Sequence, residues 1–329
     1  MKIAVVILNW NGKKLLEEFL PSVVSHSEEA TIYLADNASI DDSIDYVITR
    51  FPSVKIIRNN SNGGYAKGYN DALKKIEADV FCLLNNDVEV TKNWIHPIIT
   101  FFQENSETAI IQPKILDYKN KTHFEYAGAA GGFLDKYGYP YCRGRIFNTL
   151  EKDELQYEGV SDIFWASGAC LFIRKSIFES LGGFDESYFA HQEEIDLCWR
   201  AKNLGHQIKY VSNSVVYHLG GGTLNALNSK KTYLNFRNSL FNLTKNAKGN
   251  LFSLIIIRLK LDGIAAVKFL LSFKPNHTLA IIRAHFSFYL NLSRLLKERK
   301  ALVQSTNYYH KHSIVWQYFV KKKTTFNSL

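Results

Sequence analysis

The sequence contains little cysteine and has no long apolar run. Its four cysteines, Cys82, Cys142, Cys170 and Cys198, lie in hydrophobic contexts without C-x-x-C spacing. This pattern favours buried free thiols in a reducing compartment over disulfides or a zinc site. No stretch reaches the roughly 18 apolar residues that a membrane-spanning helix needs, and the amino-terminal apolar run breaks at Asn9, which is too short for a secretory signal. We therefore expect a cytoplasmic protein.

Proline, low-complexity tracts and internal repeats are also scarce. Only 6 of the 329 residues are proline, while 46% are hydrophobic and 14% aromatic. This composition excludes a disordered chain and predicts one large domain with an appendage, or two domains of ordinary size. The net charge of +9 is unevenly placed, because residues 251–329 contain 13 Lys or Arg against Asp262 and Glu298 only. The basic character therefore belongs to the C-terminal tail.

The first part of the chain alternates short apolar runs with amphipathic segments. The runs are rich in Ile, Val and aromatic residues and too short for helices; they cover residues 2–8, 31–36, 54–58 and 78–84. The segments between them have helical periodicity and cover residues 12–25, 41–50 and 64–77. Strands separated by helices predict an α/β fold with a mainly parallel sheet covered on both faces.

Polar residues follow each of the four predicted strands. They are Asn9 to Gly12, Asp36 to Ser39, Asn59 and Asn60, and Asn85 to Asp87. Any one of these groups is explained by a turn, since Asn, Asp and Gly are turn residues. Four such groups at the carboxyl ends of parallel strands indicate a ligand site instead, because ligands bind at that edge of an α/β sheet.

The later part of the chain changes character. We expect a helix at about 91–105, mixed strand and loop over 109–173, two short helices that end at Gly182–Gly183 and Gly205, and two further strands, QIKYV and SVVYHL. Long helices follow from about residue 231. We place a boundary within 223–232 and expect a catalytic domain at 1–228 and a basic, mainly helical region at 229–329.

Three groups of residues could support chemistry. Asp87 ends a buried strand, where a carboxylate requires hydrogen-bond donors or a cation, and a single carboxylate with substrate phosphates suits Mg²⁺ or Mn²⁺. The alternative is an Asp that caps the following helix. His218 follows an apolar strand and precedes three glycines, a flexible segment that could close over a ligand; a lone His after a strand is more often structural.

The third group is FAHQEEIDLCWR, residues 189–200. Acidic residues in the first turn of a helix complement its dipole, which is a structural explanation. Glu193, Asp196 and Arg200 share one face and can pair with each other. Glu194 points elsewhere, so we expect it to be available as a general base.

Six motifs together resemble family 2 glycosyltransferases, particularly the rhamnosyltransferase-like branch of bacterial polysaccharide synthesis. They occur in the family's order between residues 3 and 224: VVILNWNG, DNASIDDS, NNSNGGYAKGYN, LLNNDVEV, ASGACLFIRKSIFESLGGFDESYFAHQEEIDLCWR and VVYHLGGGT. The resemblance implies a GT-A fold, a Rossmann-like mixed sheet with helices on both faces, followed here by a C-terminal helical extension. It also implies a nucleotide-sugar donor, a divalent metal (Mg²⁺ or Mn²⁺) and an inverting single displacement.

The resemblance also implies roles for individual residues. Those that look like nucleotide-sugar ligands are Asn9, Asn11, Asp36, Asn62, Gly64, Tyr65, Asn70, Asn85 and Asn86. Those on the metal side are Asp87, which matches the last acid of the family's DxD motif, and His218. Glu194 matches the catalytic base, with Glu193 and Asp196 as neighbours, and Trp165, Ser167 and Gly168 are expected on the acceptor side.

The sequence departs from the family pattern at two positions. Asn85 stands where many members have the first acid of DxD, which replaces an anionic contact to the ribose or metal by a neutral one. Glu194 stands where Asp is commoner, a change of one methylene that keeps the carboxylate.

The C-terminal region has its own signal. The segment LFSLIIIRLKLDGIAAVKFLLSF has a broad apolar surface with Arg258, Lys260 and Lys268 at its margins, and VKKKTTF follows near the end. This is typical of a helix at the surface of an anionic membrane, which suits a lipid-linked acceptor. The alternative is a helical subdomain that packs on the core or on another subunit.

Other function classes fit the sequence less well. The basic tail offers aromatic residues for stacking on bases, but no nucleic-acid-binding motif accompanies them, so we expect no nucleic acid partner. A sugar nucleotidyltransferase would need a glycine-rich basic loop after the first strand, and NWNGKKLL is a poor version of one. A nucleotide-sugar-binding module without catalysis also remains open, since Asn85 lacks a charge.

Overall fold

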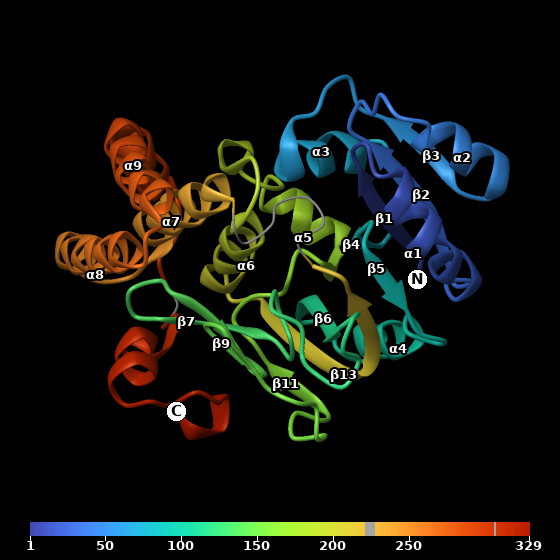
Figure 1. Cartoon of the computed structure of the whole chain (residues 1–329). Coiled ribbons are helices and arrows are strands. Elements are labelled where there is room, and N and C mark those ends of the chain that lie inside the picture. Colours follow the sequence, from blue (N-terminus) through green and yellow to red (C-terminus); the bar gives the residue numbers. More distant parts are fainter. Residues whose placement is uncertain (221–227, 306) are drawn as a thin grey trace.

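The computed structural model describes residues 1–220, 228–305 and 307–329. Its large sheet contains the four predicted strands in parallel, in the order β4-β1-β2-β3. These strands are β1 (Ile3–Asn9), β2 (Ala30–Asp36), β3 (Lys55–Arg58) and β4 (Val80–Asn85). The three predicted helices connect them: α1 (Lys13–Ser25), α2 (Ser43–Arg50) and α3 (Gly64–Leu73). The alternating pattern of the first 85 residues is thus confirmed (Figure 1).

The sheet continues beyond β4 with strands of both directions. The neighbour of β4 is β12 (Cys170–Arg174), which is antiparallel to it. Beyond β12 follow, in this order, β6 (Thr108–Asp117), β13 (Gln207–His218) and β11 (Val160–Asp162), and β5 (Val88–Val90) pairs with β13. QIKYV and SVVYHL, predicted as two strands, belong to one strand, β13, whose register shifts between Val211 and Val215. The sheet is therefore mixed rather than mainly parallel.

Both faces of the large sheet are buried. Val5 and Ile7 of β1 pack with α1 and with α4 (His96–Glu104), whereas Val6, between them, packs with Tyr69 of α3 and Trp199 of α6 (Glu193–Asn203). Successive side chains of β1 point to opposite faces of the sheet, and both sets are apolar. A sheet that lies between two layers of helices requires this pattern. The helix α5 (Lys175–Ser180) covers the second face. All four cysteines are free and buried, as predicted: Cys82, Cys142, Cys170 and Cys198.

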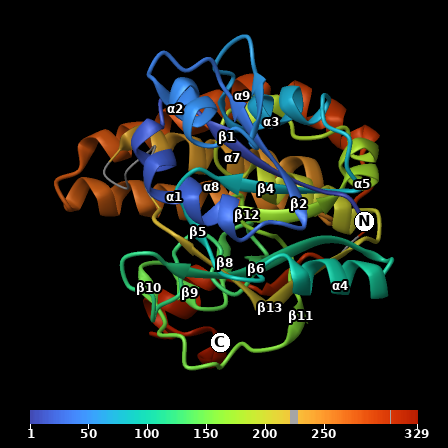
Figure 2. The same ribbon diagram turned by 90° about the vertical axis from the view of Figure 1, so that its right-hand side faces the viewer.

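A second, smaller sheet lies beside the first and contains the chain's last strand. Its order is β10 (Thr149–Leu150), β9 (Arg145–Ile146), β8 (Pro140–Cys142), β7 (Gly132–Asp135) and β14 (Tyr309–Lys311). The backbone N–H of buried Ile314 donates to Asp135 at 2.9 Å, and the Tyr308 ring lies 4.6 Å from that of Trp199. The C terminus consequently lies next to the small sheet in both views (Figures 1 and 2), after η2 (Trp316–Val320) and η3 (Phe326–Ser328).

Three long helices precede that tail, as predicted. They are α7 (Ser229–Asn246), α8 (Leu251–Leu271) and α9 (Pro275–Ala301). Asn228 and Asn250 cap α7 and α8, because their side chains accept backbone N–H groups of the first turn. Since α7 packs on α6 and β14 joins β7, the expected division at residue 228 does not separate two independent cores. The predicted boundary (223–232) and the glycines after Gly220 lie largely outside the described residues.

Candidate active site

The carboxyl ends of the parallel strands meet at one edge of the large sheet. Asn9 at the end of β1 is in register with Asp36 at the end of β2, and Leu8 is in register with Asn85 of β4. The backbone N–H of Asn85 donates to the carbonyl of Ala169 at 2.9 Å, which holds the turn before β12 at the same edge. The structure thus brings together the polar strand ends that the sequence predicts to share one site.

Asp36 presents a hydrogen-bond acceptor at this edge. Its side chain is 4% exposed, and Oδ2 accepts the backbone N–H of Ser39 at 3.1 Å. Oδ1 is buried and has no hydrogen-bond partner among the described residues. A buried acceptor without a partner costs about 1–3 kcal/mol, so this oxygen suits an N–H group of a ligand.

The other asparagines of the first turns hold those turns in place. The side-chain amide of Asn86 donates to Oδ1 of Asn9 at 3.0 Å, and Oδ1 of Asn11 accepts the backbone N–H of Ile40 at 2.8 Å. A Cβ at Gly12 would lie 2.3 Å from Oδ1 of Asn9 and 2.4 Å from Nδ2 of Asn86. Only glycine fits there, and these amides shape the site's wall rather than reach freely into it.

The segment at the start of α3 is docked onto two distant parts of the chain. The backbone N–H of Tyr65 donates to the carbonyl of Phe189 at 2.7 Å, and its hydroxyl donates to the carbonyl of Gly168 at 2.8 Å. Gly64, with φ +81°, lies so close that a Cβ would be 2.3 Å from the Phe189 oxygen. Asn62 accepts the N–H of Gly64 at 3.0 Å. Tyr65 therefore joins the predicted nucleotide side to the predicted acceptor side.

The side-chain amide of Asn70, predicted as a nucleotide-sugar ligand, is hydrogen-bonded to a turn of the chain. Its Nδ2 donates to the carbonyl of Phe184 at 2.9 Å and its Oδ1 accepts the N–H of the same residue at 2.9 Å. The side chain is buried. Because both ends of the amide are bound to this turn, the contacts that Asn70 makes here are structural.

Asp87 and His218 lie in contact, although 131 residues separate them. Nε2 of His218 is 3.1 Å from Oδ1 of Asp87, and Nδ1 is 3.3 Å from Oε1 of Glu125. Burial opposes the charged imidazole, but Glu125 and Asp87 outweigh it and raise the pKa of His218 well above its ordinary value. Burial likewise opposes the Asp87 carboxylate, and His218 outweighs it, so the pKa of Asp87 is lowered. Asn85 approaches the same ring, with Nδ2 3.5 Å from Nε2.

Glu125 was not among the predicted residues. It lies in the irregular region 109–173, in which the sequence gives no periodicity that would place a side chain. The pairing of β6 with β13 puts Asp117 opposite His218, and the segment after β6 that contains Glu125 therefore lies at this edge. No local signal in the sequence marks it.

Glu193 and Glu194 open α6 as two adjacent buried or half-buried carboxyl groups. Glu193 is 3% exposed, and its Oε2 has no hydrogen-bond partner among the described residues. Burial, and then the charge of Glu194, raise the pKa of Glu193 well above its ordinary value. Burial raises the pKa of Glu194 to about 7. Both carboxyls also raise the pKa of Tyr65, after the larger effects of its burial and of Tyr69. They follow the loop whose Phe189 carbonyl accepts the Tyr65 N–H.

Asp196, predicted as a catalytic neighbour that can pair with Arg200, does pair with it and belongs to a buried ion-pair cluster. Its carboxylate is fully buried, 2.8 Å from Nε of Arg200 and 3.1 Å from Nζ of Lys245, and it accepts the Asn246 amide at 2.8 Å. Burial opposes this charge, but Lys245 and Arg200 outweigh it and hold the pKa of Asp196 far below its ordinary value. These contacts fasten α7 to α6.

Asp196→Ala is expected to lower the free energy of unfolding by about 3–5 kcal/mol, because it removes the carboxylate paired with buried Arg200 and one of the three carboxylates around buried Lys245. Urea unfolding followed by circular dichroism measures this value. Asp162→Ala is the control, since the Asp162–Lys209 pair is exposed and contributes about 1 kcal/mol or less. Equal losses in the two variants would contradict the structural role of the Asp196 cluster.

Trp165, Ser167 and Gly168 form the floor between the two sheets. Trp165 is buried, and its indole N–H donates to the carbonyl of Phe133 at 3.0 Å. The buried hydroxyl of Ser167 is bound to the carbonyl of Ala127. Trp165 and Ser167 therefore support the expected acceptor side from below. Tyr126, the residue before Ala127 and after Glu125, is an exposed aromatic residue on this side.

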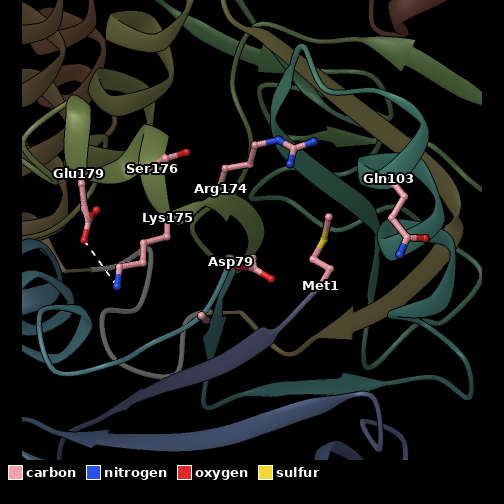
Figure 3. Close-up of a pocket in the computed structure, with 8 residues that line it drawn as sticks. Met1, Asp79, Gln103, Arg174, Lys175, Ser176 and Glu179 are labelled. Atoms are coloured by element: carbon pink, nitrogen blue, oxygen red, sulfur yellow. Dashed lines mark ion pairs between the residues drawn. The ribbon is translucent and has the colours of Figure 1, made fainter.

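A cavity lies at the other edge of the large sheet. It has a volume of about 590 Å³ and is lined by Met1, Asp79, Arg174, Lys175 and other residues at the amino ends of β1 and β4 (Figure 3). Lys175 is already paired with Glu77 at 2.8 Å. Because ligands bind at the carboxyl edge of such sheets, this cavity is not the donor site.

Comparison with known proteins fits the geometry of the carboxyl edge. Residues 4–182, more than half of the chain, match the family model described as glycosyl transferase family 2. The chain belongs to glycosyl transferase family 2. It is 25% identical over 231 residues to the N-acetylglucosaminyl-diphospho-decaprenol L-rhamnosyltransferase of Mycobacterium tuberculosis, covering 66% of this chain and 75% of that protein. It is 24% identical over 267 residues to the low-salt glycan biosynthesis hexosyltransferase Agl10 of Haloferax volcanii, covering 78% and 79%.

Solved structures show which fold this family 2 glycosyltransferase adopts. The mannosyltransferase PcManGT from Pyrobaculum calidifontis, in complex with GDP-Man and Mn²⁺, superposes with a TM-score of 0.55 at 11% identity, over 88% of this chain and 87% of that one. GalNAc-T7 with UDP, GalNAc and Mn²⁺ superposes with a TM-score of 0.57 at 18% identity, over 75% and 48%. These likenesses confirm the predicted GT-A fold.

The family 2 match ends before part of the candidate site begins. Glu193, Glu194 and His218 lie beyond residue 182, as do all the helices from α6 onward. The placement of these residues therefore depends on the geometry described above.

Proposed function

We propose that this enzyme is an inverting glycosyltransferase that moves a sugar from a UDP- or dTDP-linked donor to a hydroxyl of a saccharide or lipid-linked saccharide acceptor in cell-surface polysaccharide synthesis. One observation carries the proposal. Three groups of acidic residues lie along one connected edge: Asp36 with its unpaired acceptor, Asp87 with His218, and the Glu193–Glu194 pair. Hydrogen bonds of Asn85, the 168–169 turn and Tyr65 connect the segments that carry them. The activities of the Mycobacterium and Haloferax relatives support this substrate class.

Glu194 would act as the general base. Its carboxylate accepts the proton of the acceptor hydroxyl while that oxygen attacks the anomeric carbon, and the bond to the donor diphosphate breaks with its electron pair leaving on the diphosphate. A pKa of about 7 suits this role, because the group is ionised for half or more of the time at neutral pH and remains basic enough to take a proton. Burial and the charge of Glu194 also raise the pKa of Glu193 above its ordinary value.

Asp87 and His218 would hold the divalent metal, Mg²⁺ or Mn²⁺. Among the described residues, no three carboxyl, imidazole or thiol groups are arranged as a complete metal site. One carboxylate and one imidazole still fit an ion whose remaining ligands are diphosphate oxygens and water. When bound, such an ion neutralises the charge of the departing diphosphate. Glu125 behind His218 would orient the imidazole, as a carboxylate behind a ligating histidine does.

The test is a panel of UDP-, dTDP- and GDP-sugars with Mn²⁺ or Mg²⁺, read by thermal shift and by nucleotide release. We expect stabilisation by one nucleotide class and faster release when a lipid-linked saccharide is added. Absence of stabilisation by every donor would overturn the proposal. Binding without any release in the presence of acceptor would favour the alternative of a nucleotide-sugar-binding module.

We also propose that the enzyme is peripheral to the inner face of the membrane, through the hairpin of α8 and α9. From Gly263 to Lys297 the sequence contains five Lys or Arg and no Asp or Glu. Large apolar side chains are exposed along it, among them Leu271, Phe286, Leu290 and, at the tip, Phe273 with 94% exposure. Figure 1 shows this hairpin projecting from the side of the molecule away from β1–β3. An exposed apolar surface with only positive charge suits an anionic bilayer.

The details of this surface differ from the expectation. Lys260 and Lys268 are exposed, but Arg258 is buried, with Nε 2.8 Å from Oδ1 of Asp262 and Nη1 3.0 Å from the carbonyl of Tyr137. Arg258 therefore fastens α8 to the turn between β7 and β8 and is unavailable to lipid. No helix within the described ranges is long and apolar enough to cross a bilayer, so the proposed contact is with the membrane surface.

Flotation with liposomes tests the membrane contact. We expect recovery with anionic vesicles to exceed that with neutral ones. The double variant Leu271→Ser/Phe273→Ser should bind about 30-fold more weakly, since each removed apolar side chain contributes about 1 kcal/mol. Leu155→Ser is the matched control, because Leu155 is similarly exposed but lies in a loop before β11, outside the hairpin of α8 and α9. Lipid-independent recovery would favour packing of the hairpin on a second protein.

A further inference from the structure

The loop that leads into the proposed catalytic helix has an unusual backbone. Phe189, His191 and Gln192 have φ values of 64°, 68° and 70°, in the left-handed region. None is glycine, and Phe189 combines its positive φ with ψ −59°. Such residues persist only where their surroundings hold them, and they cluster at active sites. Glu193 and Glu194 follow directly, so the position of both carboxyls depends on this loop.

Helix α7 binds the carbonyls of this loop. The side-chain amide of Asn238, fully buried, donates to the carbonyls of Ala190 at 3.0 Å and His191 at 2.6 Å, and lies 3.2 Å from that of Tyr188. Asn242, one turn later, donates to the carbonyl of Gln192 at 3.1 Å.

Arg237 orients the Asn238 amide. Its Nε donates to Oδ1 of Asn238 at 2.8 Å, which leaves the Nδ2 hydrogens facing the loop. Its Nη2 donates to the carbonyls of Tyr188 at 2.9 Å and Ser187 at 3.1 Å. The one remaining carbonyl, that of Phe189, accepts the N–H of Tyr65. Every carbonyl from residue 187 to 192 is therefore bound, and side chains of α7 bind all but one.

We infer that Asn238, oriented by Arg237, is a positioning residue for the transfer reaction: it holds the 189–192 loop so that the Glu194 carboxylate faces the acceptor hydroxyl. The inference rests on the proposed role of Glu194. It assigns a function in the reaction to α7, which lies outside the region matched by the family model. A buried Asn whose donors all serve one strained loop does more than fill a helix interface, because a helix contact would need only an apolar side chain of that size.

The experiment uses the full chain and three variants. Asn238→Leu keeps the volume but removes the donors, and Arg237→Met removes the orienting group from a half-buried position, with less risk to folding. Thr244→Val is the matched control, because Thr244 is equally buried on α7 but its hydroxyl donates only to its own helix, at Leu240.

We expect Asn238→Leu to lower kcat about 100-fold and Arg237→Met about tenfold, since a displacement of about 1 Å at a reacting group has an effect of this size. KM for the nucleotide-sugar should stay within threefold in both, and Thr244→Val should match the wild type. A merely structural role would lower the melting temperature and leave kcat of the folded enzyme unchanged. Wild-type kcat in both variants, well below their melting temperatures, overturns the inference.

Failure of the inference can be told from failure of the proposed function. If Glu194→Gln is inactive and Asn238→Leu has wild-type kcat, only the positioning role is lost. If Glu194→Gln is itself fully active, the base assignment is wrong, and with it the premise of this inference.

Discussion

Glu194→Gln is expected to reduce turnover by about 10³-fold and to leave the thermal stabilisation by nucleotide-sugar unchanged. The substitution keeps the size of the side chain but removes the only basic atom that would accept the acceptor's proton, and general base catalysis contributes about 10²- to 10⁴-fold. The proposed donor contacts lie elsewhere, at Asp36 and Asp87. Nucleotide release with saturating acceptor, beside thermal shift with donor alone, separates the two effects.

Glu193→Gln is the matched control for this variant. Glu193 is buried, its pKa is raised above its ordinary value, and its Oε2 has no hydrogen-bond partner among the described residues, so an amide of the same shape removes no contact. We expect a loss of less than tenfold. The reverse pattern, with Glu193→Gln inactive and Glu194→Gln active, would transfer the base role to Glu193.

The pH dependence of the wild type follows from the same group. Burial raises the pKa of Glu194 from 4.5 to about 7, and only the ionised form accepts a proton. The rate should therefore rise about tenfold per pH unit below 7 and level off above it. An ordinary carboxylate would give a rate that is already constant above pH 5.5, which would contradict the buried environment described for Glu194.

The parts of the fold that the sequence predicts well depend on local pattern. Apolar runs with polar ends indicate β1 to β4, and the rule for parallel sheets places Asn9, Asp36 and Asn85 at one edge without further information. Helical spacing likewise indicates that Glu194 and Asp196 lie on different faces of α6. Asp196 contacts the Lys245 cluster, whereas the face of Glu194 is the one proposed to serve the reaction.

The remaining features depend on contacts between distant segments. Asn70 has the sequence context of a ligand, but its amide is hydrogen-bonded to a turn 114 residues away. Glu125 reaches His218 only because β6 and β13 pair, and Arg258 is buried only because the small sheet packs against α8. Asn238 could not be predicted for the same reason. Helical periodicity places it on α7 but gives no information about the loop that it binds. Residue type and spacing do not encode such pairings; the packed tertiary structure does.

The other large effect is expected at Asp87. Asp87→Asn removes the one carboxylate proposed for the metal and leaves an amide of the same shape, so the Mn²⁺-dependent part of the stabilisation by nucleotide-sugar should disappear. The relative kcat/KM should fall by about 10²- to 10³-fold, the effect typical of losing a group that stabilises a departing charge. Thermal shift with donor, measured with Mn²⁺ and with EDTA, provides the first reading, and nucleotide release provides the second.

Asp79→Asn provides the control for that variant, because Asp79 precedes the same strand, β4, at its opposite end and accepts the N–H of Lys2. It should keep the full response to Mn²⁺. His218→Ala should reproduce the Asp87 effect in weaker form, since Asp87 retains its carboxylate when its partner is removed. If Asp87→Asn and wild type respond equally to Mn²⁺ while donor binding persists, the metal is not held at the end of β4, and Asp87 serves instead to fix His218 and the turn that follows the strand.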